Sequence, residues 1–258
     1  MEFKFNFLGN QTTETKNVKC TVEDVIPARE IEILHQSISS EESEIIPELP
    51  GILKRSFPAI KANLSDFHAD GSSDVIPRVY EGGLKTWECS IDLAKFLLNN
   101  RDKFDASAVL ELGCGSALPS IVLNPPELIL QDYNAQVLES VSAPNLFLNN
   151  YSGKARFFCG DWSGLPSLLP AHQQSLILTS ETIYRPESYH LLLSIFDHAL
   201  RKDSSSLVLV AAKDYYFGLG GSVEEFAGVA RSQGWQVSRV WNHSEGVPRS
   251  ILQLKRKQ

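Results

Sequence analysis

The chain has 258 residues, with 24 lysine and arginine side chains against 31 aspartate and glutamate side chains, giving a formal net charge of −7. This length allows one large α/β domain with an appendage and a buried core. The negative charge disfavours nonspecific binding to nucleic acid, which depends on neutralising phosphates, and is compatible with a basic protein as partner. We therefore expect no direct contact with nucleic acid.

The cysteines and the apolar runs bear on the cellular compartment. Four cysteines lie far apart without a Cys-x-x-Cys pair, which indicates reduced thiols: Cys20, Cys89, Cys114 and Cys159. No run of about 18 apolar residues is present, and the start MEFKFNFLGN lacks the pattern of a signal peptide. We expect a soluble, intracellular protein without membrane contact. The six histidines have no metal-ligand spacing, so no metal site is expected.

Residues 1–75 differ in character from the rest of the chain. We expect them to form a partly ordered N-terminal extension, with residues 76–258 forming the main domain. The stretch NVKCTVEDVIPAREIEIL, residues 17–34, has strand-like apolar residues and predicts a small hairpin or an edge element. The stretch SISSEESEIIPELPG, residues 37–51, is acidic and punctuated by prolines, which predicts a solvated or loosely ordered loop.

From residue 106 onward, short apolar runs alternate with helical stretches. Near-continuous apolar runs are typical of parallel strands covered by helices on both faces, and they occur at 107–112, 127–131, 155–159, 175–180 and 206–212. Helices are expected at 134–150 and 186–202, between the strands. Together these elements predict a doubly wound, mostly parallel α/β sheet.

The last elements also have recognisable signals. Ser222 and Glu225 form a capping box ahead of a helix at 223–233, and Gly234 suits the C-terminal cap of that helix. The runs WQVSRVWN and SILQLKRK, at 235–242 and 250–257, then predict a closing antiparallel pair of strands.

A glycine motif follows the first of these strands, in the sequence LELGCGSALP. Gly113 and Gly115 leave the backbone bare for a ligand. A dinucleotide fingerprint requires a third glycine where Leu118 stands, and a phosphate loop requires a lysine that is missing. Asp132 ends the second strand, where a carboxylate can accept both hydroxyls of a ribose. This pattern predicts an adenosine compound without a diphosphate, and S-adenosylmethionine fits, although a Gly-x-Gly alone can also be a simple tight turn.

The third strand ends in the sequence CGDW, which supplies a second acidic residue and an indole. Asp161 suits the amino group of adenine, and Trp162 suits an apolar wall beside it. Core packing is the alternative role for Trp162. Its position at the carboxyl end of a strand favours the ligand site, because open α/β sheets bind ligands there.

Several phrases of the chain together resemble one family. They are YEGGLKTWECS at 80–90, LELGCGSALPS at 110–120, DYN at 132–134, GDWS at 160–163, SETIY at 180–184 and YFGLGG at 216–221, with IPARE at 26–30. These phrases resemble the seven-strand methyltransferases that methylate a protein histidine, whose known substrate is a histidine of large-subunit ribosomal protein number three. The resemblance implies a class I methyltransferase sheet, S-adenosylmethionine as cofactor, a basic ribosomal protein as partner, a monomer, a role in ribosome biogenesis, and a cytoplasmic and nuclear location.

The resemblance also implies which residues bind the cofactor. The segment Thr86, Trp87, Glu88, Cys89 and Ser90 is expected to line the methionine end. Further cofactor contacts are implied for Gly113, Gly115, Asp132, Tyr133, Asn134, Gly160, Asp161, Trp162 and Ser180. Thr86 departs from the larger aliphatic residue expected at its position, and the sequence NPPE, residues 124–127, predicts a short helix after the glycine motif.

The chemistry of histidine methylation narrows the catalytic candidates. A neutral imidazole is abundant near neutral pH, so no strong base is needed and positioning supplies most of the acceleration. An acceptor for the opposite ring N–H selects the tautomer and stabilises the imidazolium formed. Glu181, Tyr184 and Asp214 are candidates, and a structural hydrogen bond is the alternative role for each. Tyr215, Tyr216 and Phe217 are candidate substrate contacts, with sealing of the core as their alternative.

Three other functions compete with this interpretation. Related protein-lysine methyltransferases share the tryptophan and glycine motifs but usually carry Asp-x-x-Tyr where this chain has SETIY. A nicotinamide-dependent oxidoreductase is disfavoured by Leu118. A methyltransferase-like module that binds a ribosomal factor without turnover would share the same motifs.

Overall fold

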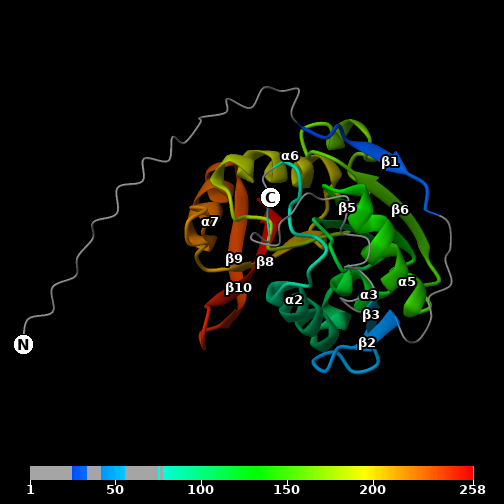
Figure 1. The fold of residues 1–258 in the computed structure, drawn as a ribbon. Coiled ribbons are helices and arrows are strands. Elements are labelled where there is room, and N and C mark those ends of the chain that lie inside the picture. The colour runs from blue at the N-terminus through cyan, green and yellow to red at the C-terminus, as the bar shows by residue number, and fades with distance from the viewer. Residues whose placement is uncertain (1–24, 34–41, 56–74, 76–77, 258) are drawn as a thin grey trace, which may run out of the picture.

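The computed structural model describes residues 25–33, 42–55, 75 and 78–257, and these residues are built around one large β-sheet (Figure 1). Its strands follow the order β1-β6-β5-β4-β7-β8-β10-β9. The five central strands are parallel, and their bounds are β4 (Ala108–Leu112), β5 (Glu127–Asp132), β6 (Lys154–Cys159), β7 (Leu176–Ser180) and β8 (Leu207–Lys213). The predicted doubly wound sheet is confirmed.

The sheet is buried on both faces, as the apolar runs predicted. In β4, Val109 belongs to the hydrophobic cluster on one face, whereas Leu110 and Leu112 belong to the cluster on the other. The first cluster is covered by α2 (Glu88–Asn99), α3 (Leu118–Leu123) and α5 (Ala143–Leu148), and the second by α6 (Tyr189–Ala199) and α7 (Val223–Ser232) (Figure 1). Because β4 is central and both faces are covered, its carboxyl end lies in the middle of one edge of the sheet.

The helices follow the sequence signals closely. The short α3 ends before the proline pair, as predicted. The helix expected at 134–150 is continuous but contains a π-helical turn, η5 (Leu138–Ser142), between α4 (Ala135–Val137) and α5. The helix expected from 186 begins with a 3-10 turn, η7 (Pro186–Ser188), and further 3-10 turns are η4 (Arg101–Lys103) and η6 (Leu165–Ser167).

The C-terminal elements also match the prediction. The Ser222 hydroxyl accepts a hydrogen bond from the backbone N–H of Glu225 at 3.2 Å, and Gly234 follows α7 with φ +90°. Strands β9 (Trp235–His243) and β10 (Arg249–Arg256) form an antiparallel pair, and β10 is also antiparallel to β8.

The N-terminal segments pack onto the main domain, and one prediction needs correction. Strand β1 (Arg29–Ile31) pairs antiparallel with β6, so an edge element is confirmed there, while residues 17–24 and 34 lie outside the described residues. In the acidic stretch, β2 (Ser43–Ile45) pairs with β3 (Leu53–Arg55), and Ile46 and Leu49 are fully buried in the core. The expected solvated loop is therefore wrong for residues 42–51, because two apolar side chains anchor the hairpin; residues 37–41 lie outside the described part.

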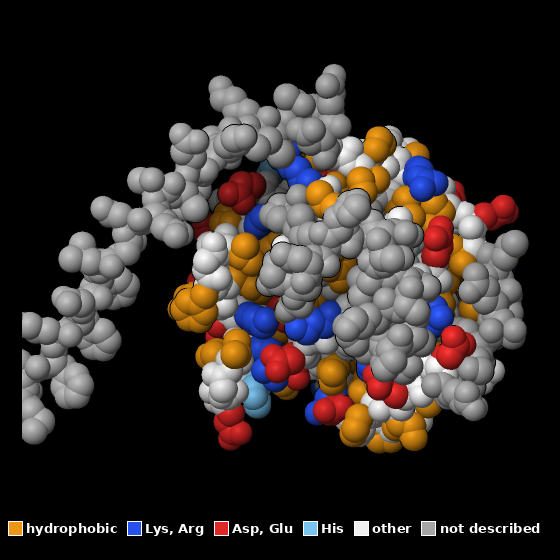
Figure 2. Space-filling view, viewed as in Figure 1, with side chains coloured by type: hydrophobic (Ala, Val, Ile, Leu, Met, Phe, Trp, Pro, Cys, Tyr) orange, Lys and Arg blue, Asp and Glu red, His pale blue; other side chains and the backbone are white. Residues whose placement is uncertain are grey.

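The surface around these elements mixes both charges. Figure 2 shows basic and acidic side chains interspersed among hydrophobic ones on the face in view. Among the described helices, none combines the length and apolar character needed to cross a bilayer. In the same described ranges, no group of three or more His, Cys, Asp or Glu side chains is arranged to hold a metal ion.

Gly160, at the end of β6, is where the N-terminal segment meets the sheet. Its φ is +104°, and a Cβ there would lie 2.3 Å from the carbonyl oxygen of Pro27. We expect Gly160→Ala to lower the free energy of unfolding by at least about 2 kcal/mol, because backbone strain and a backbone clash add. Gly246→Ala is the matched control, since Gly246 has φ +70° and open space around it. Urea unfolding measures both, and equal losses would contradict the packing argument.

Candidate active site

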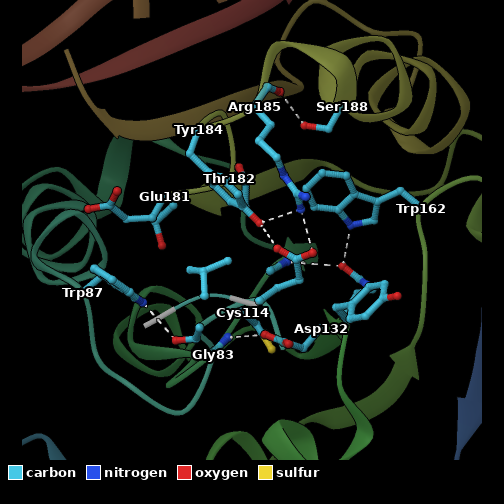
Figure 3. Close-up of a pocket in the computed structure, with 18 of the residues that line it drawn as sticks. Gly83, Trp87, Cys114, Asp132, Trp162, Glu181, Thr182, Tyr184, Arg185 and Ser188 are labelled. Atoms are coloured by element: carbon cyan, nitrogen blue, oxygen red, sulfur yellow. Dashed lines mark hydrogen bonds and ion pairs between the residues drawn. The ribbon is translucent and has the colours of Figure 1, made fainter. Parts of the chain in front are cut away.

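A cavity of about 670 Å³ opens at the carboxyl ends of the parallel strands, a volume that suits a small-molecule ligand. Figure 3 shows Trp87 and Glu181 toward one end of it and Asp132 and Trp162 toward the other. Thirteen of the residues predicted for the site line this cavity: Trp87, Ser90, Gly113, Gly115, Asp132, Tyr133, Gly160, Asp161, Trp162, Ser180, Glu181, Tyr184 and Tyr216. The structure therefore brings most of the predicted residues together.

The glycine turn lies against the acidic residue that follows the next strand. The backbone N–H of Gly115 donates to Asp132 Oδ2 at 3.0 Å, and the N–H of Asn134 donates to Oδ1 at 3.3 Å. Gly83 packs so closely that a Cβ on it would lie 2.9 Å from Asp132 Oδ2. Because each carboxylate oxygen can accept more than one bond, Asp132 keeps capacity for two hydroxyl groups in the cavity.

Burial also changes the acidity of this carboxylate. Asp132 is 4% exposed, and the loss of solvent raises the pKa of its side chain to about 6 in spite of the backbone hydrogen bonds it accepts. A buried carboxylate without an ion-pair partner costs stability in the free protein. A ligand that brings hydroxyl donors would offset this cost.

The end of β6 supplies the wall at this side. The indole N–H of Trp162 donates to Gln131 Oε1 at 2.8 Å, and the same oxygen accepts from the Gly113 N–H at 3.3 Å. Gln131 also donates from Nε2 to the Gly160 carbonyl at 3.0 Å. One glutamine thus connects three strand ends and sets the orientation of the indole.

Two predicted residues beside Asp132 hold the N-terminal segments in place. The Tyr133 hydroxyl donates to the Arg78 carbonyl at 2.8 Å and accepts from the Ile26 N–H at 3.2 Å. Asn134 does not line the cavity; its amide donates to the Val79 carbonyl at 2.7 Å. In the structure the Asn134 side chain therefore anchors the segment around Val79, and its predicted cofactor contact stays a prediction.

The segment 80–90 forms one side of the cavity, through only some of the residues that were predicted and through others that were not. Gly82, Gly83, Lys85 and Trp87 line it, and the Trp87 indole N–H donates to the Gly82 carbonyl at 3.0 Å. Among the five residues Thr86 to Ser90, only Trp87 and Ser90 line it. Since α2 starts at residue 88, successive side chains of the helix point in different directions. Thr86, Glu88 and Cys89 are not among the lining residues, although the Cys89 thiol lies close enough to Glu181 for that carboxylate to raise its pKa, after burial.

A polar network ties this segment to the end of β7. The Tyr184 hydroxyl donates to Glu81, and Arg185 Nη2 donates to Glu81 Oε1 at 2.6 Å (Figure 3). Burial, followed by the nearby Glu81 charge, raises the pKa of Tyr184, so the hydroxyl stays protonated. The Tyr184 hydroxyl already donates its proton to Glu81. Tyr184 is therefore a weaker candidate than Glu181 for the residue that holds the imidazole.

Glu181 lines the cavity and has an unusual backbone conformation. It follows β7 with φ +59°, a left-handed conformation that costs energy in a residue other than glycine. The Tyr216 hydroxyl donates to Glu181 Oε2 at 2.7 Å, and Lys213 Nζ lies 3.8 Å from Oε1. Oε1 is buried and has no hydrogen-bond partner. Glu181 is therefore the catalytic candidate that lines the cavity and has a carboxylate oxygen without a hydrogen-bond partner. The Cys89 thiol lies close to it, and burial followed by the Glu181 charge raises the pKa of that thiol.

The residues at the end of β8, of which Asp214, Tyr215, Tyr216 and Phe217 were predicted for the site, point in different directions. Lys213 lines the cavity, whereas Asp214 turns toward β10 and accepts a hydrogen bond from the Ser250 hydroxyl at 2.6 Å. Successive residues of a strand point to opposite sides, which separates these two. Likewise Tyr216 faces inward, while Tyr215 and Phe217 are 61% and 93% exposed and lie outside the cavity.

Sequence reasoning missed several residues of this site. Gln131 is a polar side chain near the end of an apolar strand, and Lys213 is a charge at the end of another, so both had a signal in the sequence. The pairing of Glu81 with Arg185 had none, because the two residues are 104 positions apart.

Comparison with known proteins identifies the family. Residues 79–216 match a family model described as "Lysine methyltransferase". A Bos taurus protein named histidine protein methyltransferase 1 homolog is 32% identical over 258 residues, covering 83% of this chain and 68% of that protein. The chain belongs to this histidine protein methyltransferase 1 family. The resemblance stated from the sequence phrases is thereby confirmed.

Further members of the histidine protein methyltransferase 1 family differ in how much they share with the chain. The Dictyostelium discoideum homologue is 38% identical over 157 residues, and the Schizosaccharomyces pombe protein is 40% identical over 207. The chain spans 50% and 59% of the lengths of these two relatives. A human protein-lysine N-methyltransferase matches more weakly, at 27% identity over 129 residues and 44% of this chain.

Solved structures confirm the class of fold in this family. The structure of magnesium protoporphyrin IX methyltransferase from Synechocystis, with bound SAH, superposes with a TM-score of 0.51 at 12% identity, over 65% of this chain and 82% of that one. The YcgJ protein of Bacillus superposes with a TM-score of 0.53 at 11% identity, over 65% and 99%. The sheet is that of a Rossmann-like class I methyltransferase.

Proposed function

We propose that this chain transfers a methyl group from S-adenosylmethionine to a histidine of a protein, and that the substrate is a histidine of large-subunit ribosomal protein number three. The observation that carries the proposal is the arrangement in one cavity of the glycine turn and Asp132 at one end and Glu181 at the other. Membership of a family whose relatives are named for histidine methylation supports the acceptor. The ribosomal substrate is what the family resemblance carried by the phrases YEGG…WECS and SETIY implies.

The residues present fit an adenosyl cofactor. Asp132 offers two buried oxygens for ribose hydroxyls, and Trp162 offers an indole held by Gln131 beside Asp161. When bound, the cofactor supplies an electrophilic methyl group on a sulfonium. The chain itself positions the acceptor and excludes water, and it supplies the hydrogen-bond acceptor for the ring.

Glu181 is the residue to which we assign the acceptor role. Its free Oε1 can accept the N–H of the imidazole, which leaves the lone pair of the opposite ring nitrogen available for attack. Its negative charge then stabilises the imidazolium that forms. The Tyr216 hydroxyl, at 2.7 Å from Oε2, holds the carboxylate in this orientation.

The proposal also covers the partner, the oligomeric state and the cellular location of the protein. A net charge of −7 suits a basic ribosomal protein better than nucleic acid. We propose a monomer that acts in the cytoplasm and the nucleus during ribosome biogenesis, with Tyr215 and Phe217 contacting the substrate outside the cavity.

A protein-lysine methyltransferase is the second candidate, and the description of the matching family model favours it. Peptide mass spectrometry of large-subunit ribosomal proteins, from cells with and without this gene, separates the two candidates. We expect a mass increment of about 14 Da, one methyl group in place of a hydrogen, on a histidine only when the gene is present. An increment on lysine instead would favour the second candidate, and an unchanged map would overturn both assignments to these proteins.

A further inference from the structure

The end of the cavity near Glu181 already contains an ammonium group from the chain itself. Lys213 Nζ lies 3.8 Å from Glu181 Oε1, 5.0 Å from the centroid of the Trp87 ring and 6.0 Å from that of Tyr216. The Lys213 side chain is 22% exposed and that of Glu181 is 8% exposed. The ammonium is thus enclosed by a carboxylate and two aromatic rings.

These are the groups that a lysine acceptor would require. A substrate ammonium is held by aromatic faces and by a carboxylate, and it must be desolvated before it can react. Here the Trp87 ring is contacted by two cations, since Lys85 Nζ lies 4.6 Å from its centroid. Glu81, the next carboxylate along the wall, is bonded to Arg185 and Tyr184. The ammonium of an incoming lysine would therefore meet the positive charges of Lys213 and Lys85, while the carboxylates it needs are already paired.

An uncharged ring meets different conditions at the same place. A neutral imidazole can donate its N–H to Glu181 Oε1, which accepts no hydrogen bond in the structure. A fixed cation nearby also disfavours the protonated form of an imidazole, so the reactive neutral form is favoured. The same lysine therefore penalises an ammonium acceptor and favours the neutral form of an imidazole, while the Glu181 carboxylate offsets the charge of the imidazolium that forms.

We propose that Lys213 is a specificity-determining residue: its ammonium takes the place that a lysine acceptor would need and restricts the site to a neutral imidazole. This inference rests on the proposed function, because it assumes that methyl transfer to histidine takes place in this cavity. It goes further by naming the residue that separates histidine from lysine acceptors in a family whose model carries the lysine description.

The test compares two peptides of about 15 residues, long enough to bind in extended form, that carry either histidine or lysine at the position identified by mass spectrometry. Equilibrium binding is measured by calorimetry with S-adenosylhomocysteine present, so the readout does not depend on turnover. Methylation of both peptides is measured in parallel. The variants are Lys213→Met, which keeps the apolar stem, and Lys213→Arg, which keeps the charge; Lys95→Met is the matched control, because Lys95 is exposed on α2.

We expect the unmodified protein and the Lys213→Arg and Lys95→Met variants to prefer the histidine peptide by about tenfold or more in affinity. In Lys213→Met the preference should fall to about threefold or less, through tighter binding of the lysine peptide to the exposed carboxylate. Unchanged preference in Lys213→Met, with S-adenosylhomocysteine still bound, would overturn the inference and leave the proposed function standing. Binding of the histidine peptide without any methylation of it would instead overturn the proposed function.

Discussion

Replacing Asp132 with asparagine is expected to abolish measurable binding of S-adenosylhomocysteine while the protein stays folded. The carboxylate lies at the centre of the glycine turn, and an amide offers one acceptor oxygen instead of two. Hydrogen bonds to a charged group contribute about 1.5–3 kcal/mol each, so the loss of two corresponds to roughly 10²–10⁴ in affinity. Calorimetry with the purified protein measures this directly.

The pH dependence of stability gives an independent test of the same residue. Burial raises the pKa of Asp132 from its ordinary 3.8 to about 6, so the folded state binds the proton more tightly than the unfolded state. Its contribution to stability therefore falls as pH rises from about 4 to about 6, by up to ~3 kcal/mol, and the loss is complete above that range. The Asp132→Asn variant has no titrating group at this position, so this part of the pH dependence of stability should be absent from it.

We therefore compare the thermal unfolding midpoint of Asp132→Asn with that of the unmodified protein. The difference, variant minus unmodified protein, should rise as pH increases from 4 to 7, because this range spans the pKa of Asp132 in the unfolded state, 3.8, and in the folded state, about 6. Asp102→Asn serves as control, because Asp102 is exposed in the turn after α2 and should leave both affinity and pH dependence unchanged. Retained affinity in Asp132→Asn, or a pH-independent difference, would show that this carboxylate is not the cofactor's anchor.

Replacing Glu181 with glutamine is expected to lower turnover on the histidine substrate by about 10²–10³-fold, with S-adenosylhomocysteine affinity changed by less than about threefold. The substitution preserves size and hydrogen bonding to Tyr216 but removes the charge that stabilises the imidazolium. The separation of turnover from cofactor affinity is the diagnostic feature, because Glu181 lies at the end of the cavity away from Asp132 and Trp162 (Figure 3). Single-turnover kinetics with saturating cofactor measures the chemical step.

Two further variants test this assignment against its competitors. Tyr216→Phe should lower turnover by about tenfold, because it removes the hydrogen bond that orients Glu181. Glu139→Gln removes an exposed carboxylate from η5 and should have no effect. A large loss of turnover in Asp214→Asn or Tyr184→Phe, with little in Glu181→Gln, would assign the acceptor to one of those residues instead.

The sequence determined the order and type of the central elements. Continuous apolar runs such as that of β4 occur because both faces of a parallel sheet are buried, and this pattern is local. The glycine turn and Asp132 were also predictable as neighbours, since consecutive parallel strands end at the same edge of the sheet. The hairpin around Ile46 was not predictable, because its acidic composition outweighed two apolar residues whose partners lie elsewhere in the chain.

Only the tertiary structure decided which side chains face the cavity. Three features determine which of two neighbouring side chains lines the cavity. They are the positive φ of Glu181, the residue at which α2 begins, and the alternating directions of Lys213 and Asp214. These choices depend on contacts between segments roughly a hundred residues apart, such as Glu81 with Arg185. Local sequence patterns act over a few residues, whereas direction at a strand end is set by the packing of the whole domain.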